Sequence, residues 1–306
     1  MKILLTGGTG FIGAELLKHL TTWEVVLLTR DIGAAQKKLQ HTDIGNIKYI
    51  ENLALLDSLD GFDAVVNLAG EPIANKRWSE AQKQKICDSR WQTTAQIVEL
   101  IQASQTPPSV FISGSAVGYY GDQKAHPFDE TLHVESDAFA HQVCTEWERI
   151  ALHAQSERTR VCVIRTGVVL GLDGGALKKM WLPYQLGLGG PIGQGEQYIP
   201  WIHLLDQIGA ILYLLETTQA HGIFNLCAPH PVTNAMFSKT LAKTLHRPHL
   251  LTTPKWGIRL LLGEGACLLL DSLRAKPKRL TEIGFQFSFS HLEPALKNLV
   301  SLSNKG

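Results

Sequence analysis

The chain has 306 residues, of which 44% are hydrophobic and 19% charged, and its formal net charge is +1 at pH 7. This length suffices for one large α/β domain or two closely joined lobes, and so small a charge speaks against a nucleic-acid or membrane partner. Five scattered cysteines without a Cys-x-x-Cys pair predict a cytoplasmic protein with no structural zinc and no other metal site. We therefore expect a small-molecule substrate, and a homo-oligomer is left open.

A glycine-rich turn follows the first apolar run, residues 3–5. It contains Gly7, Gly10 and Gly13 and leads directly into a helical pattern. The order strand, tight turn, helix is typical of a site where a pyrophosphate lies on a helix N-terminus. Gly7 and Gly10 are predicted to let phosphate oxygens approach the backbone, and Gly13 to let helix and strand pack closely. The turn predicts a dinucleotide-binding protein.

The second predicted strand, residues 24–30, ends in Thr29 and Arg30. NAD-binding proteins usually place a carboxylate at this end, where it binds the ribose diol. A carboxylate would repel a 2′-phosphate, whereas the Arg30 guanidinium can bind one and can stack on adenine. This favours NADP(H) over NAD(H). An ordinary solvated surface arginine remains the alternative.

Apolar, strand-like runs recur along the chain, with helical patterns between most of them. The runs cover residues 3–5, 25–28, 47–50, 64–68, 110–112, 161–164 and 223–226, and the long helical patterns cover 79–104 and 139–156. This alternation predicts an α/β fold with a doubly wound parallel Rossmann sheet, whose ligand crevice lies at the carboxyl ends of the strands.

The second half of the chain differs in composition, because glycine and proline become frequent from residue 171 onward. We expect an NADP-binding Rossmann domain formed by residues 1–170 and 203–228, and a smaller C-terminal substrate-binding lobe formed by 171–202 and 229–306. Residues 260–273 are apolar but are interrupted by Glu264 and Asp271, so they are interpreted as a buried or interface-covering helix and not as a membrane span.

Motifs throughout the chain resemble those of the extended short-chain dehydrogenase/reductase superfamily, which includes NAD-dependent epimerases and dehydratases. The resemblance lies in residues 6–13, 67–70, 113–121, 164–167 and 201–206. More narrowly, residues 115–121, 144–148 and 278–285 resemble the YfcH-type epimerase-like subgroup, whose members have no settled substrate.

The resemblance implies roles for particular residues. The segment from Asn67 to Gly70 would lie beside the nicotinamide ribose, Gly167 and Val168 beside the nicotinamide ring, and Asn52 and Leu53 beside the adenine. Ser115 would orient the reacting oxygen, with Ser113 as the alternative. The residues predicted to bind the cofactor are Gly7, Gly10, Phe11, Ile12, Gly13, Thr29, Arg30, Asn52, Leu53, Leu68, Ala69, Gly70, Ser113, Gly167 and Val168.

One departure from the superfamily concerns its proton-transferring Tyr-x-x-x-Lys pair. Anchoring the alignment on Glu148 puts Ala140 at the tyrosine position and Cys144 at the lysine position. Alanine has no proton to give, and cysteine has no positive charge with which to lower the pKa of a neighbouring phenol. Cys144 is either a small apolar filler or a reactive thiol.

Three nearby side chains are candidate substitutes for the missing proton donor. Tyr119 and Tyr120 follow the serine loop, although aromatic packing is an equal alternative for both. His141 lies three residues from Cys144 on the same predicted helix and titrates in the useful range, but an exposed, non-catalytic histidine is also compatible with the pattern.

A second departure concerns the substrate. Sugar-nucleotide enzymes commonly carry an arginine before the histidine-containing strand, where it grips a diphosphate, but this chain has Ile199-Pro200-Trp201 there. We therefore expect an NADP(H)-dependent oxidoreductase that acts on a small carbonyl or alcohol. Ser115 would orient the substrate, and Tyr119, Tyr120 or water would supply the proton. The alternatives are a nucleotide-sugar epimerase and a non-catalytic NADPH-binding sensor or scaffold.

Overall fold

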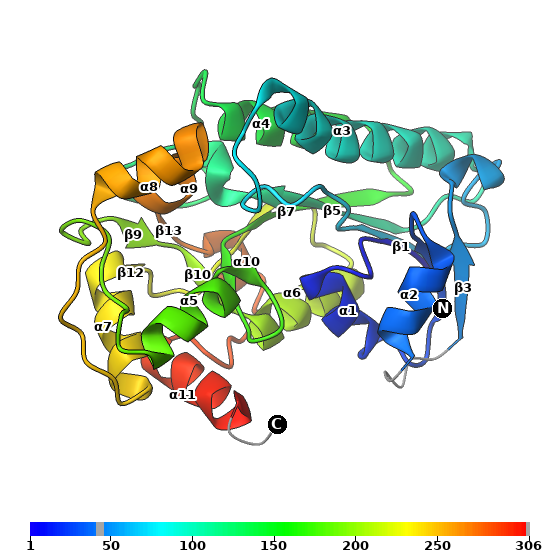
Figure 1. The fold of residues 1–306 in the computed structure, drawn as a ribbon. Coiled ribbons are helices and arrows are strands. Elements are labelled where there is room, and N and C mark those ends of the chain that lie inside the picture. Colours follow the sequence, from blue (N-terminus) through cyan, green and yellow to red (C-terminus); the bar gives the residue numbers. More distant parts are fainter. Residues whose placement is uncertain (41–45, 304–306) are drawn as a thin grey trace.

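The computed structural model describes residues 1–40 and 46–303, and its centre is a seven-stranded parallel sheet (Figure 1). The strands are β1 (Lys2–Thr6), β2 (Glu24–Leu28), β3 (Ile47–Ile50), β4 (Ala64–Asn67), β5 (Val110–Ala116), β7 (Arg160–Thr166) and β11 (Gly222–Leu226). Their spatial order is β11-β7-β5-β4-β1-β2-β3, and every neighbouring pair is parallel. The predicted doubly wound sheet is confirmed. Its strand order reverses between β1 and β4, where a crevice is expected at the carboxyl ends.

Helices cover both faces of the sheet. They are α1 (Phe11–Leu17), α2 (Ile32–Leu39), α3 (Glu80–Ala103), α4 (Phe139–Leu152) and α6 (Leu204–Glu216). Alternate residues of β1 point to opposite faces, as the period of a strand requires: Ile3 and Leu5 pack in the cluster that contains α1 and α6, whereas Leu4 packs with α3 and α4. Figure 1 shows α3 and α4 above the sheet and α1, α2 and α6 below it. Burial on both faces explains why the strand runs are continuously apolar.

The long α3 has clear start and stop signals. The Ser79 side chain caps its first turn by accepting a hydrogen bond from the Gln82 backbone N–H, and the helix ends before Ser104 and a Pro107-Pro108 pair. The predicted range of 79–104 therefore includes the observed helix and its two capping residues.

The C-terminal region has a hydrophobic core of its own. Its core side chains come from several short elements and include Leu170, Leu177, Trp201, Phe237 and Leu296. The elements outside the central sheet and its covering helices are β6 (Pro127–Phe128), β8 (Val168–Leu170), β9 (Tyr198–Ile199), β10 (Trp201–His203), β12 (Val232–Thr233), β13 (Arg274–Ala275), α5 (Gly175–Gln185), α7 (Asn234–Thr244), α8 (Lys255–Leu262), α9 (Cys267–Leu270), α10 (Lys278–Glu282), α11 (Leu292–Ser303) and the 3-10 turns η1 (Leu53–Leu55), η2 (Val117–Tyr120) and η3 (Gly263–Ala266). A separate core fits a smaller lobe, and the domain boundaries given above stay a prediction.

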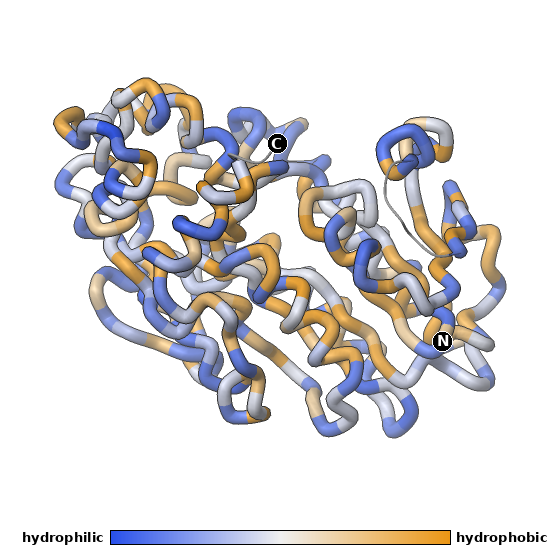
Figure 2. Tube along the Cα trace, turned by 90° about the horizontal axis from the view of Figure 1, so that it is seen from below, coloured by the Kyte–Doolittle hydropathy of each residue, from blue (hydrophilic) through white to orange (hydrophobic). Residues whose placement is uncertain are grey.

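Residues 260–273 do not form a single buried helix, so this alternative is wrong, whereas an interface-covering role for the segment stays a prediction. The segment divides into α8, η3 and α9, because Gly263 ends α8 with a positive φ of 59°. No residue of α8 is buried, and Trp256, Leu260 and Leu261 are 71%, 72% and 71% exposed. In Figure 2, hydrophobic stretches accordingly lie at the edge formed by the C-terminal region as well as through the middle of the molecule. Within residues 1–40 and 46–303, no helix is long and apolar enough to cross a bilayer.

Candidate functional site

The glycine turn between β1 and α1 has a geometry that excludes side chains. Gly7 has a φ of +71°, and a Cβ there would lie 2.5 Å from the Leu68 carbonyl oxygen. A Cβ on Gly13 would overlap the Gly7 carbonyl oxygen, which accepts a hydrogen bond from the Gly10 N–H at 2.8 Å. Helix α1 starts after Gly10 without a side-chain cap, so its first N–H groups are free to bind an anion. The turn has the form of a pyrophosphate cradle.

A cleft of about 640 Å³ opens beside this turn, at the carboxyl ends of β1, β2 and β4. Its volume lies in the range typical of small-molecule and cofactor sites. The predicted cofactor residues that line it are Gly7, Gly10, Thr29, Arg30, Asn52, Leu53, Leu68, Ala69 and Gly70. The structure therefore brings most of the predicted cofactor-binding residues together in one place.

The remaining predicted cofactor residues lie outside the lining of this cleft. Phe11 packs its ring against the segment after β8, Ile12 contacts the main core, and Gly13 lies behind the turn. Ser113 is fully buried, and its hydroxyl donates to the Gly114 carbonyl at 3.4 Å. Gly167 and Val168 run against Pro200, whose carbonyl accepts the Val168 N–H at 2.7 Å. Their direct contact with a cofactor stays a prediction.

Two cations flank the adenine end of the cleft. Arg30 is exposed and has no hydrogen-bond or ion-pair partner among the described residues. Lys38, on α2, also lines the cleft, and its Nζ donates to the Thr9 carbonyl in the glycine turn at 2.7 Å. Asp31 lies between them in sequence, but its carboxylate accepts the Ala34 N–H at 2.8 Å and caps α2. Lys38 is not among the residues predicted from the sequence, because its contact joins residues 29 positions apart.

A hydrogen-bond network fixes the floor of the cleft. The Thr6 hydroxyl donates to Asn67 Oδ1 at 2.6 Å, and the Asn67 amide donates to the Thr94 hydroxyl at 2.8 Å. The Trp147 indole N–H donates to the same hydroxyl at 2.8 Å, and the Ala69 N–H donates to the Thr6 hydroxyl at 3.1 Å. The network joins β1, β4, α3 and α4, and so holds the loop after β4 in position.

Ser115 lies near the carboxyl end of β5, outside the lining of the cleft, in a buried charged network. Its hydroxyl donates to Glu148 Oε1 at 2.6 Å, and Arg165 grips both oxygens of that carboxylate, at 2.8 and 2.7 Å. Burial alone would lower the pKa of Arg165, but hydrogen bonding and attraction to Glu148 raise it above its ordinary value. Ser115 therefore gives its proton to a carboxylate and can only accept a hydrogen bond from a ligand. The pairing of Glu148 with Ser115 and Arg165 is not apparent from the sequence, because these residues lie on different elements.

The two tyrosines have different surroundings. Tyr120 is fully buried, its hydroxyl donates to Asn225 Oδ1 at 2.8 Å, and burial raises its pKa. The Tyr119 ring lies 3.4 Å from the Arg165 Cζ, and its hydroxyl has no hydrogen-bond partner in the described part of the chain. His141 is buried, and its Nδ1 lies 2.5 Å from the Tyr119 carbonyl oxygen. The role of either tyrosine as a proton donor stays a prediction.

Helix α4 places Ala140 and Cys144 near the serine loop, as the alignment predicts. A Cβ on Gly118 would lie 3.4 Å from the Ala140 Cβ. Cys144 is 4% exposed and packs with Val117, Tyr119 and Tyr120. Burial, together with the nearby Glu148 carboxylate, raises the pKa of its thiol to about 11. This environment fits an apolar filler better than a reactive thiol.

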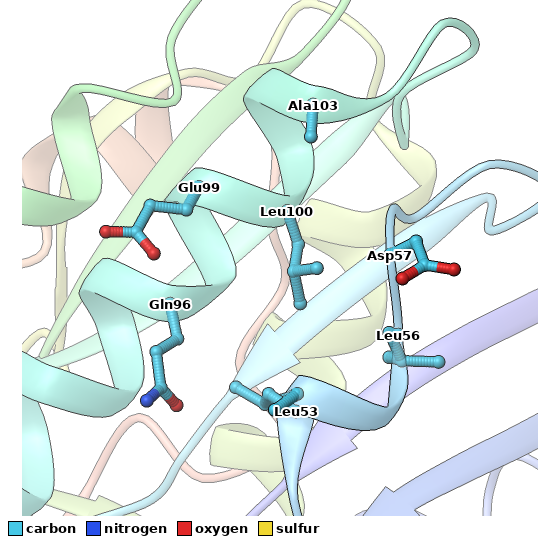
Figure 3. A pocket seen from close by; sticks show the side chains of 8 residues that line it. Leu53, Leu56, Asp57, Gln96, Glu99, Leu100 and Ala103 are labelled. Atoms are coloured by element: carbon cyan, nitrogen blue, oxygen red, sulfur yellow. The ribbon is translucent and has the colours of Figure 1, made fainter.

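A second depression, of about 330 Å³, lies between η1 and α3 and shares Leu53 and Gln96 with the cleft. Figure 3 shows that the carboxylates of Asp57 and Glu99 on its rim point away from each other. Leu53, Leu56 and Leu100 supply most of the remaining wall. Because its polar groups do not converge on one point, this depression does not have the arrangement of a catalytic site.

The cradle, the cleft and the strand order agree with the result of comparing the chain with known protein families. Residues 3–227 match the model of the NAD dependent epimerase/dehydratase family. The chain belongs to this family. The resemblance found in the sequence is thereby confirmed. In addition, residues 253–299 match the model of a domain of unknown function, DUF1731.

Relatives in the family span nearly the whole chain. Epimerase family protein SH2119 of Staphylococcus haemolyticus is 36% identical over 301 residues, which cover 98% of this chain and 99% of that protein. The chloroplastic epimerase family protein SDR39U1 homolog of Arabidopsis thaliana is 38% identical over 304 residues, which cover 98% and 87%.

Solved structures show the same fold. Human epimerase family protein SDR39U1 (isoform 2), crystallised with NADPH, matches with a TM-score of 0.90 and 36% identity over 98% of this chain and 99% of that chain. UDP-glucuronic acid 4-epimerase from Bacillus cereus, in complex with UDP-glucuronic acid and NAD, matches with a TM-score of 0.77 at 18% identity over 99% and 100%. The second likeness shows the fold alone.

Proposed function

We propose that the chain is an NADP(H)-binding oxidoreductase of the extended short-chain type, acting on a small and largely apolar carbonyl or alcohol. The observation that carries the proposal is the cleft, which combines an uncapped glycine turn with the cations Arg30 and Lys38. Such a site suits a pyrophosphate and a further phosphate on the adenosine ribose. The NADPH in the human relative's crystal structure supports the same cofactor here.

Each residue of the site has a separate task in this proposal. A bound nicotinamide dinucleotide would supply or accept the hydride. The glycine turn would hold its pyrophosphate, and Ser115, which can only accept a hydrogen bond, would orient the hydroxyl group of an alcohol. Tyr119 or water would move the proton, since the Tyr120 hydroxyl is already bonded to Asn225.

The surroundings of Ala140 support an apolar substrate. Trp78, Ile86, Val143 and the partly buried Phe139 form a hydrophobic cluster with Ala140, at the position where the superfamily has its tyrosine. Charged groups of a nucleotide sugar would lose hydration against these apolar side chains. The buried or half-buried state of all five cysteine thiols also supports a reducing compartment, the cytoplasm.

The direct test combines NADPH with a panel of apolar aldehydes and ketones. We expect saturable binding of NADPH, and net loss of its absorbance matched by equimolar alcohol. Tyr119→Phe should lower turnover without changing NADPH affinity if that phenol moves the proton. Absence of NADPH binding would overturn the proposal.

A second candidate is a non-catalytic NADPH-binding protein. It is favoured by the internal bonding of Ser115, Tyr120 and Arg165, which leaves few free polar groups at the reaction end. Binding of NADPH without turnover on any member of the panel would support this candidate. Interconversion of UDP-sugars without net use of the cofactor would instead indicate an epimerase.

A further inference from the structure

The missing lysine leaves a second task open besides lowering the pKa of a phenol. In the superfamily that lysine also holds the nicotinamide ribose, and in this chain its position on α4 is taken by the buried Cys144. Cys144 carries no positive charge and is not a strong hydrogen-bond donor. A hydrogen-bond donor from another element could bind the ribose hydroxyls in its place.

Arg90, on α3, reaches this position from the opposite helix. Its guanidinium carbon lies 5.2 Å from the centre of the Trp147 ring, and Trp147 is three residues after Cys144, on the same face of α4. The positive charge of Arg90 acts on Cys144 and lowers the pKa of its thiol, although burial dominates and raises that pKa overall. Arg90 and Cys144 are therefore close neighbours across the α3–α4 contact.

The Arg90 side chain is held on one edge only. Its Nη1 donates to the Glu71 carbonyl at 3.1 Å and to the Ile86 carbonyl at 3.0 Å. Its Nη2 and Nε have no hydrogen-bond partner in the described part of the chain. Neither of them is a fully buried unpaired atom, so both keep some exposure. These donors remain available to a ligand in a guanidinium whose orientation is already set.

The guanidinium lies directly against the wall of the cleft. A Cβ on Gly70, which lines the cleft, would lie 2.9 Å from the Arg90 Cζ and 3.0 Å from its Nη2. Gly70 follows Asn67, whose amide fixes the loop after β4 through Thr94. Arg90 is not itself among the residues that line the cleft, but residue 70, which does line it, has no side chain that would separate the guanidinium from it.

We infer that Arg90 takes over the binding task of the absent lysine and holds the nicotinamide ribose of the cofactor through its free guanidinium donors. The inference rests on the proposed NADP(H) function. Because a guanidinium stays protonated, Arg90 binds the ribose but does not take part in proton transfer. The binding task and the acid–base task of the usual lysine are therefore separate in this chain.

The test compares two ligands that differ in the part Arg90 would touch. NADPH contains the nicotinamide ribose, whereas 2′-phospho-ADP contains only the adenosine 2′-phosphate and the diphosphate. Arg90→Gln should weaken NADPH about 10-fold to 100-fold, the range for losing a hydrogen bond from a charged group, and leave 2′-phospho-ADP unchanged. Arg90→Lys should recover part of the loss. Arg30→Ala is the matched control and should weaken both ligands.

Gly70→Ala provides a second route that keeps the arginine. The added Cβ would displace the guanidinium, so NADPH should again weaken and 2′-phospho-ADP should not. Both titrations are made on protein with an unchanged circular dichroism spectrum. Equal loss of both ligands in the Arg90 and Gly70 variants, or no loss of either, would overturn the inference while leaving the proposed function intact. Failure of the unaltered protein to bind NADPH would overturn both.

Discussion

The two ends of the site differ in what their polar groups contact. At the adenine end, the first N–H groups of α1 are uncapped and Arg30 has no partner in the described part of the chain. At the proposed reaction end, Ser115, Glu148, Arg165 and Tyr120 are buried and bonded within the protein. A group without a partner is available to a ligand, whereas a satisfied buried network contributes to rigidity. Substitutions at the first end should therefore change affinity, and substitutions at the second should change stability.

The largest effect on affinity is expected from Gly10→Val. Even a Cβ at this position would lie 3.0 Å from the Gly7 carbonyl oxygen, and the valine methyl groups would occupy the space of the pyrophosphate. Losing two charged hydrogen bonds, of about 1.5–3 kcal/mol each, should weaken NADPH by ~100-fold or more. Fluorescence titration measures this. Gly33→Ala is the control, because its Cβ would make only an ordinary 3.5 Å contact with Asp31. Retained affinity in folded Gly10→Val would remove the turn from the site.

The largest effect on stability is expected from Glu148→Gln. The variant leaves Arg165, which is 2% exposed, without its carboxylate partner, and breaking a buried pair from one side costs about 3–5 kcal/mol. Chemical unfolding measures the change. The matched control is Glu146→Gln, whose pair with Arg149 is 36% and 55% exposed and should cost no more than about 1 kcal/mol. A cost as small as that of the control would contradict the proposed contrast between the two ends.

Arg30→Ala should separate the two cofactors. Loss of a charge-assisted bond to the 2′-phosphate should weaken NADPH about 10-fold to 100-fold and leave NADH nearly unchanged. Lys38→Ala should act in the same direction. Lys37, one position earlier on α2, does not line the cleft, so Lys37→Ala is the control and should have no effect. Equal losses of NADPH and NADH would show that Arg30 does not contact the phosphate.

Tyr120→Phe should change stability and not affinity. It removes the hydrogen bond to Asn225 in a fully buried position, which costs about 1–2 kcal/mol. Tyr119→Phe removes a hydroxyl that is not bonded to another described residue, so it should cost less. Thermal unfolding and NADPH titration of both variants test the difference, and a larger loss of NADPH affinity than of stability in Tyr120→Phe would contradict it.

The smallest effect concerns the reactivity of Cys144. With a thiol pKa of about 11, only about one molecule in 10³ or fewer carries the thiolate at pH 8. Alkylation by iodoacetamide should therefore be slow in the folded protein, rise as the pH approaches that pKa, and become fast in denaturant. Mass spectrometry of the modified peptide measures this. Rapid labelling of the native protein at pH 8 would make Cys144 a reactive group.

Local sequence signals predicted much of the fold and the adenine end of the site. The turn at Gly7 and Gly10 needs only neighbouring residues, and the capping residue Ser79 marks the start of α3 in the sequence itself. The segment after residue 260 was less predictable, because its apolar residues suggested one buried or interface-covering helix, whereas Gly263 divides it and Leu260 is exposed. Composition alone does not show which side of a short helix meets the core.

Contacts between distant elements could not be predicted. Arg90 meets Trp147 from another helix, and Arg165 on β7 pairs with Glu148 on α4. Neither pair has a spacing that periodicity would reveal, because both depend on how helices pack on the sheet. The missing Tyr-x-x-x-Lys pair was visible in the sequence, but the cation beside its former position was visible only after folding.

The packing of Phe11 has a consequence for how this sequence can evolve. Cβ atoms on Gly171 and Gly174 would each lie 2.6 Å from the Phe11 ring, and one on Gly175 would lie 3.1 Å from it. A substitution at Gly171 or Gly174 is thus harmful mainly while the large ring is present. At Gly175 the backbone itself also opposes a side chain, because its φ is +72° and a Cβ there would lie 2.9 Å from the Val169 carbonyl oxygen. Replacing Phe11 by a smaller residue should make alanine tolerable at residues 171 and 174, so the fitness effects of these positions are conditional on one another. In related sequences, a smaller residue at position 11 and larger residues at positions 171 and 174 should accordingly occur together.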